Sequence, residues 1–132
     1  MDSLVALGYL VAPVPIGTTL QRSYVVDGAM LTHHVPARAP VLMTPNLVAL
    51  LEDASAEIVR PLLTPGSAAV GTWVGIHHTG IARLAETVDV TTVVREVAGR
   101  RITFDVTARV GDRPVGHGDI AFTFVASPPP RS

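Results

Sequence analysis

The clearest helical periodicity in the chain runs from Met43 to Leu62, in the sequence MTPNLVALLEDASAEIVRPL. On a helical wheel of about 100° per residue its apolar positions gather on one face. The centre of that face is formed by Leu47, Leu50, Leu51, Ala54 and Ile58. Thr44 is predicted to cap the start with its hydroxyl, Pro45 fits the first turn, and Pro61 ends the helix. The segment therefore predicts one amphipathic helix that packs through a single face.

One acidic residue of this helix stands apart from the other charged residues. Asp53 and Glu57 fall on the polar stripe, whereas Glu52 falls next to Val48 and Val59. A carboxylate on the apolar side loses contact with water and needs a compensating partner. Glu52 is therefore either an edge residue in an ordinary salt bridge or part of a functional site, and the wheel alone does not separate the two.

After this helix the periodicity changes from about 3.6 residues to two, which predicts strands. In VGTWVGIHHT the alternation puts Val70, Thr72, Val74, Ile76 and His78 on one face and His77 on the other. Further strands are predicted in ETVDVTTVVREV, RITFDVTARV and VGHGDIAFTFV, with a bulge at Gly116 to Gly118, and an earlier strand around Thr18 to Val26.

Short turns such as AGRR and GDRP connect these strands, which is typical of an antiparallel meander. The single long helix must bury its apolar face against that sheet. The sequence thus predicts an α+β fold, a curved antiparallel sheet wrapped around one long central helix. Within the 132 residues we expect an N-terminal arm or short helix over 1–16, a single domain over 17–126 and a disordered tail over 127–132.

Composition narrows the possible partners and chemistry. The net charge is −1 with no basic block, so we expect no nucleic-acid partner. The apolar N-terminal segment is interrupted by prolines and has no basic residue, so neither a membrane span nor a signal peptide is predicted, and a cytoplasmic location is the default. Hydrophobic residues make up 48% of the chain and charged ones 16%, an apolar surplus that a homodimer interface would bury.

Two residue types are absent. Without Cys there is no thiol nucleophile, disulfide or thiolate metal site, and because all ten basic residues are Arg there is no lysine for Schiff-base chemistry. Adjacent histidines on a strand point to opposite faces, so the pairs His33-His34 and His77-His78 do not predict a metal site. The set that remains is Thr44 at the helix start, Glu52 on its apolar side and His78 on a strand that packs against it.

The segments TPNLVALLE and PLLTPGSAAVGTWVGIHHTG, with the strands that follow as far as Gly118, resemble the fluoroacetyl-CoA thioesterase family of hotdog-fold acyl-CoA thioesterases. That family carries a Thr and a Glu eight positions apart on the central helix, then a Gly-Thr strand that ends in His-Thr. The matching residues here are Thr44, Glu52, Gly71, Thr72, His78 and Thr79. There are two departures: the segment before Thr44 lacks a phenylalanine, and Phe122 stands where an arginine is usual.

The resemblance implies a hotdog-fold thioesterase that hydrolyses a short-chain acyl-CoA or carrier-protein-bound acyl thioester. It implies a homodimer with the site near the subunit interface, and neither a metal nor a cofactor. Thr44, Glu52 and His78 would be catalytic, with Glu52 as general base or as nucleophile, and Gly71, Thr72 and Thr79 would bind substrate. Two alternatives stay open: a non-catalytic acyl-CoA-binding module, and a hotdog dehydratase of a biosynthetic pathway.

Overall fold

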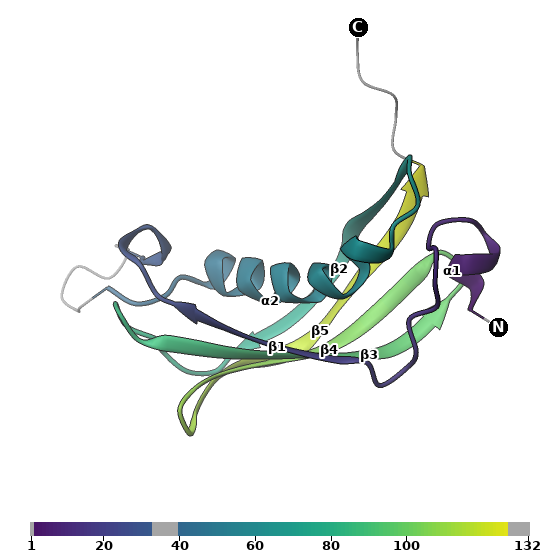
Figure 1. Cartoon of the computed structure of the whole chain (residues 1–132). Helices are drawn as coiled ribbons and strands as arrows, with labels where there is room; N and C mark the ends of the chain where they lie inside the picture. The colour runs from purple at the N-terminus through teal and green to yellow at the C-terminus, as the bar shows by residue number, and fades with distance from the viewer. Residues whose placement is uncertain (1, 33–39, 127–132) are drawn as a thin grey trace, which may run out of the picture.

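The structure, a computed structural model, describes residues 2–32 and 40–126. Five strands form one antiparallel sheet in the order β1-β3-β4-β5-β2, and the helix α2 lies along its concave side (Figure 1). The bounds are α1 Ser3–Ala6, β1 Thr19–Val25, the 3-10 turn Gly28–Met30, α2 Thr44–Val59, the 3-10 turn Arg60–Leu62, β2 Ser67–His78, β3 Thr87–Ala98, β4 Arg101–Val110 and β5 Arg113–Ala126. The predicted α+β architecture, a curved sheet around one central helix, is confirmed.

Helix α2 packs on the sheet through the face that the periodicity predicts. Its buried residues are Leu47, Leu50, Leu51, Ala54, Ser55 and Val59. The buried Ser55 hydroxyl donates to the Leu51 carbonyl oxygen at 2.9 Å and lies 2.8 Å from the Thr92 hydroxyl on β3. This bond between helix and sheet satisfies two buried polar groups and fixes which side of α2 faces each strand.

The start of α2 differs from the prediction. Met43 occupies the N-cap position and makes no side-chain capping bond, and Thr44 is already the first helical residue. The prediction that Thr44 caps the helix is therefore wrong. The reason is a tertiary partner, described below, that takes up the hydroxyl. At the other end α2 stops at Val59, before the turn that contains Pro61.

Strand β4 alternates as predicted, with Ile102, Phe104, Val106 and Ala108 buried beneath α2. The bulge predicted at Gly116 to Gly118 is wrong in position. The register between β4 and β5 shifts between Ala108 and Arg109, where Val115 is the extra residue of β5. Gly116 and Gly118 both stay in register. Their lack of a side chain allows close packing: a Cβ at Gly116 would lie 2.9 Å from Leu47 Cδ2, and one at Gly118 would overlap the Gly75 carbonyl.

A second bulge changes the faces of β2. The pairing of β2 with β5 shifts between Gly71 and Trp73, which leaves Thr72 as the extra residue. Beyond it Val74, Ile76 and His78 pair with the inward positions Ile120, Gly118 and Gly116, as predicted. Before it the parity is reversed, so Val70 pairs with the outward Thr123. The prediction that Val70 and Thr72 share the face of His78 is therefore wrong.

The N-terminal segment packs across one end of the sheet (Figure 1). Leu4, Leu10 and Val14 are buried, and the Tyr9 ring lies 6.0 Å from that of Phe124. Asp2 accepts from the backbone N–H groups of Leu4 and Val14 and so holds the arm in a closed loop. Residues 127–132, predicted as a tail, lie outside the described residues. Over 2–32 and 40–126, no helix has the length and apolar character needed to cross a bilayer.

Candidate active site between the central helix and the edge strand β2

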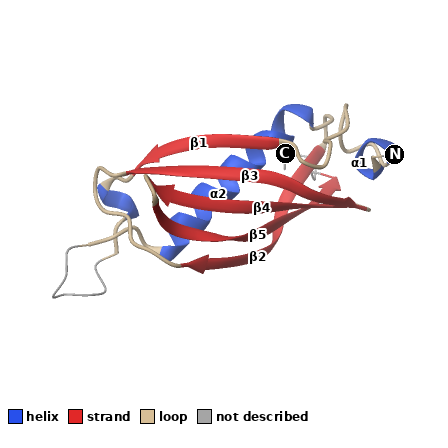
Figure 2. Cartoon of the chain, turned by 90° about the horizontal axis from the view of Figure 1, so that it is seen from below, coloured by secondary structure: helices blue, strands red, loops and turns tan. Residues whose placement is uncertain are grey.

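Strand β2 forms one edge of the sheet, and α2 crosses diagonally behind the sheet in the view of Figure 2. The side chains of Thr44, at the start of α2, and His78, at the end of β2, meet across this junction. Thr44 Oγ1 lies 2.7 Å from His78 Nδ1. The tautomer of the imidazole decides which of the two groups donates. The hydroxyl that would have capped the helix is thus a partner of the imidazole.

Glu52 reaches a different point of the same strand. A Cβ built on Gly71 would lie 3.4 Å from Glu52 Oε1 and 3.6 Å from Phe122 Cε1. The carboxylate and the phenyl ring therefore bound the small space that the missing side chain of Gly71 leaves open. Phe122 is buried and packs edge-on against Phe104, with ring centroids 5.7 Å apart. Glu52 itself is half-buried, so it stands at the border between this apolar wall and solvent.

The two parts of the site do not touch within one chain. Thr44 and Glu52 lie eight positions apart on α2, a rise of about 12 Å at 1.5 Å per residue. Gly71 and His78 are correspondingly far apart along β2. The structure therefore brings Thr44 to His78, and Glu52 to Gly71, as two separate pairs on the inner side of the edge strand.

The two threonines expected to bind substrate, Thr72 and Thr79, lie outside these two pairs. The Thr72 hydroxyl lies 2.7 Å from the Thr123 hydroxyl, on the face of the sheet away from α2. Thr79 follows β2, where its backbone N–H donates to the Val115 carbonyl at 2.9 Å, and it is exposed. Its position directly after His78 leaves it at the same end of the strand as the Thr44–His78 pair.

The outer face of the sheet carries a polar row that the sequence analysis missed. The Trp73 indole N–H donates to Asp119 at 2.7 Å, and Arg95 donates to Asp119 at 3.1 Å and to Asp105 at 2.7 Å. The hydrogen bond from Trp73, and after it the bond from Arg95, lowers the pKa of Asp119 below its ordinary value, against the opposing effect of partial burial. The signal in the sequence was Gly75, two residues after Trp73, which leaves room for the indole.

The two neighbouring histidines of β2 are separated by the sheet. His77 stacks on His117 of β5, with ring centroids 5.1 Å apart, on the outer face, while His78 faces α2. Two stacked imidazoles are not a metal site by themselves. Within residues 2–32 and 40–126, no group of three or more His, Cys, Asp or Glu side chains is arranged to hold a metal ion.

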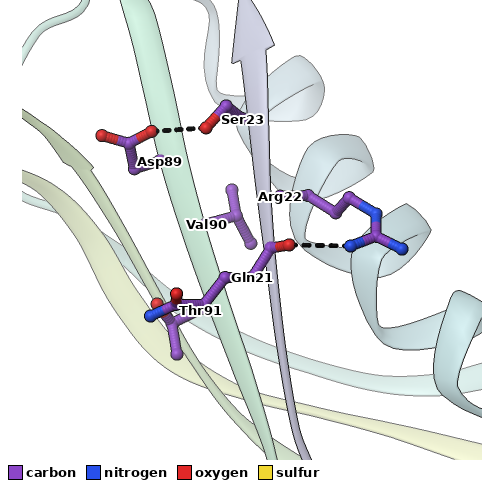
Figure 3. A pocket seen from close by; sticks show the side chains of 6 residues that line it. All are labelled: Gln21, Arg22, Ser23, Asp89, Val90 and Thr91. Carbon is purple, nitrogen blue, oxygen red and sulfur yellow. Dashed lines mark hydrogen bonds between the residues drawn. The ribbon is translucent and has the colours of Figure 1, made fainter.

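A polar pocket of about 390 Å³ lies at the opposite edge of the sheet, on β1 and β3 (Figure 3). Its lining residues are Gln21, Arg22, Ser23, Asp89, Val90 and Thr91. Ser23 donates to Asp89 at 2.7 Å, and the Arg22 side chain leaves the pocket towards α2, where it pairs with Glu57 at 2.6 Å. Its ionisable side chains are thus already paired, and it contains none of the candidate residues.

In chemical terms, the inner side of the β2 edge offers a carboxylate beside an apolar wall and a hydroxyl–imidazole pair at a helix N-terminus. A carboxylate and an imidazole can accept and return protons, and a helix N-terminus favours negative charge. This combination is suited to attack on a carbonyl carbon, where an oxyanion develops and a leaving group needs a proton.

Comparison with known proteins agrees with this chemistry. The family model described as fluoroacetyl-CoA-specific thioesterase matches residues 25–126. The fluoroacetyl-CoA thioesterase of Streptantibioticus cattleyicolor is 30% identical over 110 residues, which cover 78% of this chain and 79% of that protein.

Solved structures show the same similarity. The structure of the fluoroacetyl-CoA thioesterase FlK matches with a TM-score of 0.81 at 27% identity, covering 87% of this chain and 90% of that one. A variant of FlK in complex with fluoroacetate and CoA matches with a TM-score of 0.78 at 28% identity, over 86% and 96% of the two chains. A thioesterase superfamily member from Thermus thermophilus shares the fold, with a TM-score of 0.79 at 24% identity over 88% and 87%.

Proposed function

The chain belongs to the fluoroacetyl-CoA-specific thioesterase family, hotdog-fold hydrolases of acyl-CoA thioesters, and on that basis we propose that it hydrolyses a short-chain acyl-CoA with Glu52, His78 and Thr44. The observation that carries the proposal is the 2.7 Å bond between Thr44 Oγ1 and His78 Nδ1. It diverts the threonine hydroxyl from the helix end, where such hydroxyls ordinarily bond, to an imidazole.

Each residue has a defined role in this proposal. Glu52 takes a proton from water, or attacks the carbonyl carbon itself to give a mixed anhydride that water then opens. The C–S bond breaks, and His78, as imidazolium, gives its proton to the departing thiolate. The proton released by the attacking water restores the imidazolium, so the site returns to its starting state. Thr44 holds His78 in the required orientation. The products are a carboxylic acid and the free thiol of coenzyme A.

The acyl group would occupy the space over Gly71. The Glu52 carboxylate and the Phe122 ring bound this space on two sides, because a Cβ at Gly71 would meet both at contact distance. A small space favours a short acyl chain.

We propose further that the protein is a homodimer in which the exposed β2 edges of two chains pair. The edge exposes Val70, Trp73 and Val74, and an unpaired edge of this kind is ordinarily covered. Pairing would also explain the gap of about 12 Å between Thr44 and Glu52, because antiparallel β2 strands related by a two-fold axis near Gly75 set the partner's His78 opposite Gly71. Each site would then use Glu52 of one chain with the Thr44–His78 pair of the other.

A thiol-release assay over a panel of acyl-CoAs from acetyl to octanoyl, with fluoroacetyl-CoA and acyl carrier-protein conjugates included, tests the activity. We expect the highest kcat/KM with a two- to four-carbon acyl-CoA. If acyl-CoAs bound with micromolar affinity but no thiol appeared, the acyl-CoA-binding module would be the correct function. Formation or loss of a double bond in a 3-hydroxyacyl substrate, without thiol release, would instead favour the dehydratase.

Mixing two inactive variants tests where the site lies. Glu52→Gln and His78→Ala chains, unfolded together and refolded, form heterodimers in which one of the two sites has both native groups if the site spans two chains. Activity should then return to about one quarter of wild type, because half of the dimers are mixed and half of their sites are intact. A site within one chain would give no recovery, and refolded wild type is the control for yield.

A further inference from the structure

The outer face of the sheet carries a row of side chains that crosses four strands directly behind the candidate site. It runs from Arg95 on β3 through Asp105 on β4 and Asp119 on β5 to Trp73 on β2. Asp105 and Asp119 are paired directly across β4 and β5, an arrangement that repels unless a cation bridges it. Arg95 is that cation, and it is the extra residue of a bulge in β3, where the register shifts between Val94 and Glu96.

At its β2 end the row lies next to the bulge at Thr72. Trp73 directly follows Thr72, the extra residue, and its indole is held in place from two sides. Its N–H donates to Asp119, and the ring edge lies over Gly75, where a Cβ would come within 3.1 Å of Trp73 Nε1 and 2.8 Å of Asp119 Oδ1. The indole remains 52% exposed, so burial alone does not fix it. The indole is fixed instead by its hydrogen bond to Asp119 and by the absence of a side chain at Gly75.

The bulge has a direct effect on the inner face. Side chains alternate along a strand, so Gly71 and His78, an odd number of residues apart, would face opposite sides of a regular strand. The extra residue Thr72 turns both toward α2. Bulges commonly redirect a side chain next to an active site, and they persist when the surrounding structure holds them.

We propose that Trp73, Asp119 and Arg95 are positioning residues that hold the Thr72 bulge and so keep Gly71 under Glu52 while His78 meets Thr44. The proposal rests on the proposed function for its catalytic consequence, whereas its structural part stands alone. An ordinary surface ion pair would link Arg95 to either acid and leave β2 unaffected. An ion pair alone does not explain why the row continues from Asp119 to Trp73, the residue that follows the bulge.

The structural part is tested by nuclear magnetic resonance of the full chain. The protein has one tryptophan, so a ¹⁵N–¹H spectrum contains one indole N–H signal, which reports the bond to Asp119. Asp119→Ala should shift that signal and the backbone amide signals of Gly71 and Thr72. Asp119→Asn keeps an acceptor oxygen and should shift them less. The control is Asp89→Ala, which removes a comparable outer-face acceptor, bonded to Ser23, where β1 and β3 pair regularly.

The catalytic part is tested by steady-state kinetics on the same variants, with circular dichroism to normalise for folded protein. Because a misplacement of about 1 Å can cost about 100-fold, we expect kcat of Asp119→Ala to fall at least about tenfold with KM changed less than about twofold. Asp119→Asn should recover most of that loss, and Asp89→Ala should retain wild-type kcat.

Three results would overturn the proposal. The first is unchanged Gly71 and Thr72 amide signals in Asp119→Ala, and the second is shifted signals with unchanged kcat. The third is an equal loss in the Asn and Ala variants, because the retained acceptor should matter. If the wild-type chain hydrolyses no thioester, the proposed function fails instead, and the amide signals still decide whether the row holds the bulge.

Discussion

Gly71 and His78 lie seven positions apart on β2, and both face α2. Regular alternation would have placed them on opposite sides of the sheet. The single extra residue Thr72 therefore decides whether the Glu52 pair and the Thr44 pair belong to the same surface of the protein.

Replacing Glu52 by Gln should leave the fold intact and lower kcat by about 100-fold or more, the usual cost of losing an acid–base group. The change is nearly isosteric and removes a half-buried charge, so the melting temperature should stay the same or rise slightly. Thiol release at saturating acyl-CoA is the measurement. Asp53→Asn, on the exposed neighbour, is the matched control. Activity of Glu52→Gln within about threefold of wild type would remove Glu52 from the chemistry.

The neighbouring histidines should respond differently to alanine. His78 bonds Thr44 on the inner face, whereas His77 stacks on His117 on the outer face. His78→Ala should lower kcat by about 100-fold, and His77→Ala by less than about fivefold. Both variants are compared side by side, with the oligomeric state checked by sedimentation. A larger loss for His77→Ala would move the site to the other face of the sheet.

Thr44 should matter for activity and hardly for stability. Since Met43, not Thr44, is the N-cap residue, Thr44→Val removes no capping bond and should not show the loss of about 1 kcal/mol that a lost cap causes. It does remove the bond to His78, so kcat should fall at least about tenfold, while Thr44→Ser keeps the hydroxyl and most of the activity. Urea unfolding and thiol release separate the two effects. A valine variant that is destabilised yet fully active per folded molecule would contradict the assignment.

Filling the space over Gly71 should exclude substrate without unfolding the protein. The Cβ of Gly71→Ala would stand 3.4 Å from Glu52 Oε1 and 3.6 Å from Phe122 Cε1, close but tolerable contacts. We expect kcat/KM to fall at least about tenfold, more for butyryl-CoA than for acetyl-CoA, with little change in melting temperature. Gly28→Ala, where no atom lies within 4 Å of the added Cβ, is the control. An unchanged acyl-chain profile would mean that the acyl group binds elsewhere.

Glu86 should make stability depend on pH in the acid range. Arg113 donates to both carboxylate oxygens at 2.8 Å, and this hydrogen bonding, followed by the bond from the Arg83 backbone N–H, lowers the pKa of Glu86 below 4.5. A group with a lowered folded pKa adds stability above its unfolded pKa and loses it as the pH falls through the folded pKa.

The melting temperature of wild type should therefore exceed that of Glu86→Gln at pH 7, and the difference should shrink as the pH falls below about 4.5. Differential scanning calorimetry at several pH values is the measurement, and Asp53→Asn serves as a control without such a pairing. A difference that stays constant down to pH of about 2.5 would show that the ionic form of Glu86 adds nothing.

The sequence predicted those elements whose signals are local. The apolar face of α2 and the alternation of Ile102, Phe104 and Val106 in β4 depend only on the spacing of residues along one segment. Glu52 was found in the same way, because it interrupts an apolar face, whereas Gly71, Thr72 and Thr79 came only from the family resemblance. Long, strongly periodic segments of this kind carry the most information that a single sequence contains.

The features that were missed depend on two segments at once. A bulge is a mismatch between paired strands, so Thr72 carries no sign of it in its own neighbourhood, and the glycines after Val115 indicated a bulge but not its position. Thr44 satisfies every local rule for a cap, and only the fold supplies His78 as a competing partner. Asp119, likewise, becomes an acceptor for Trp73 only because β2 and β5 pair in one register.

The N-terminal arm has a consequence for synthesis on the ribosome. Tyr9 packs against Phe124, and the Ser3 hydroxyl donates to the Gly99 carbonyl at 2.6 Å, so the arm completes its packing only when β5 has been made. Until then Leu4 and Leu10, buried in the finished fold, lack part of their cover, although Leu10 already has its bridge partner Leu63. Contacts this distant in sequence form slowly, and exposed leucines invite chaperones and proteases. The yield of this protein in a cell should therefore depend on how quickly translation passes through β5.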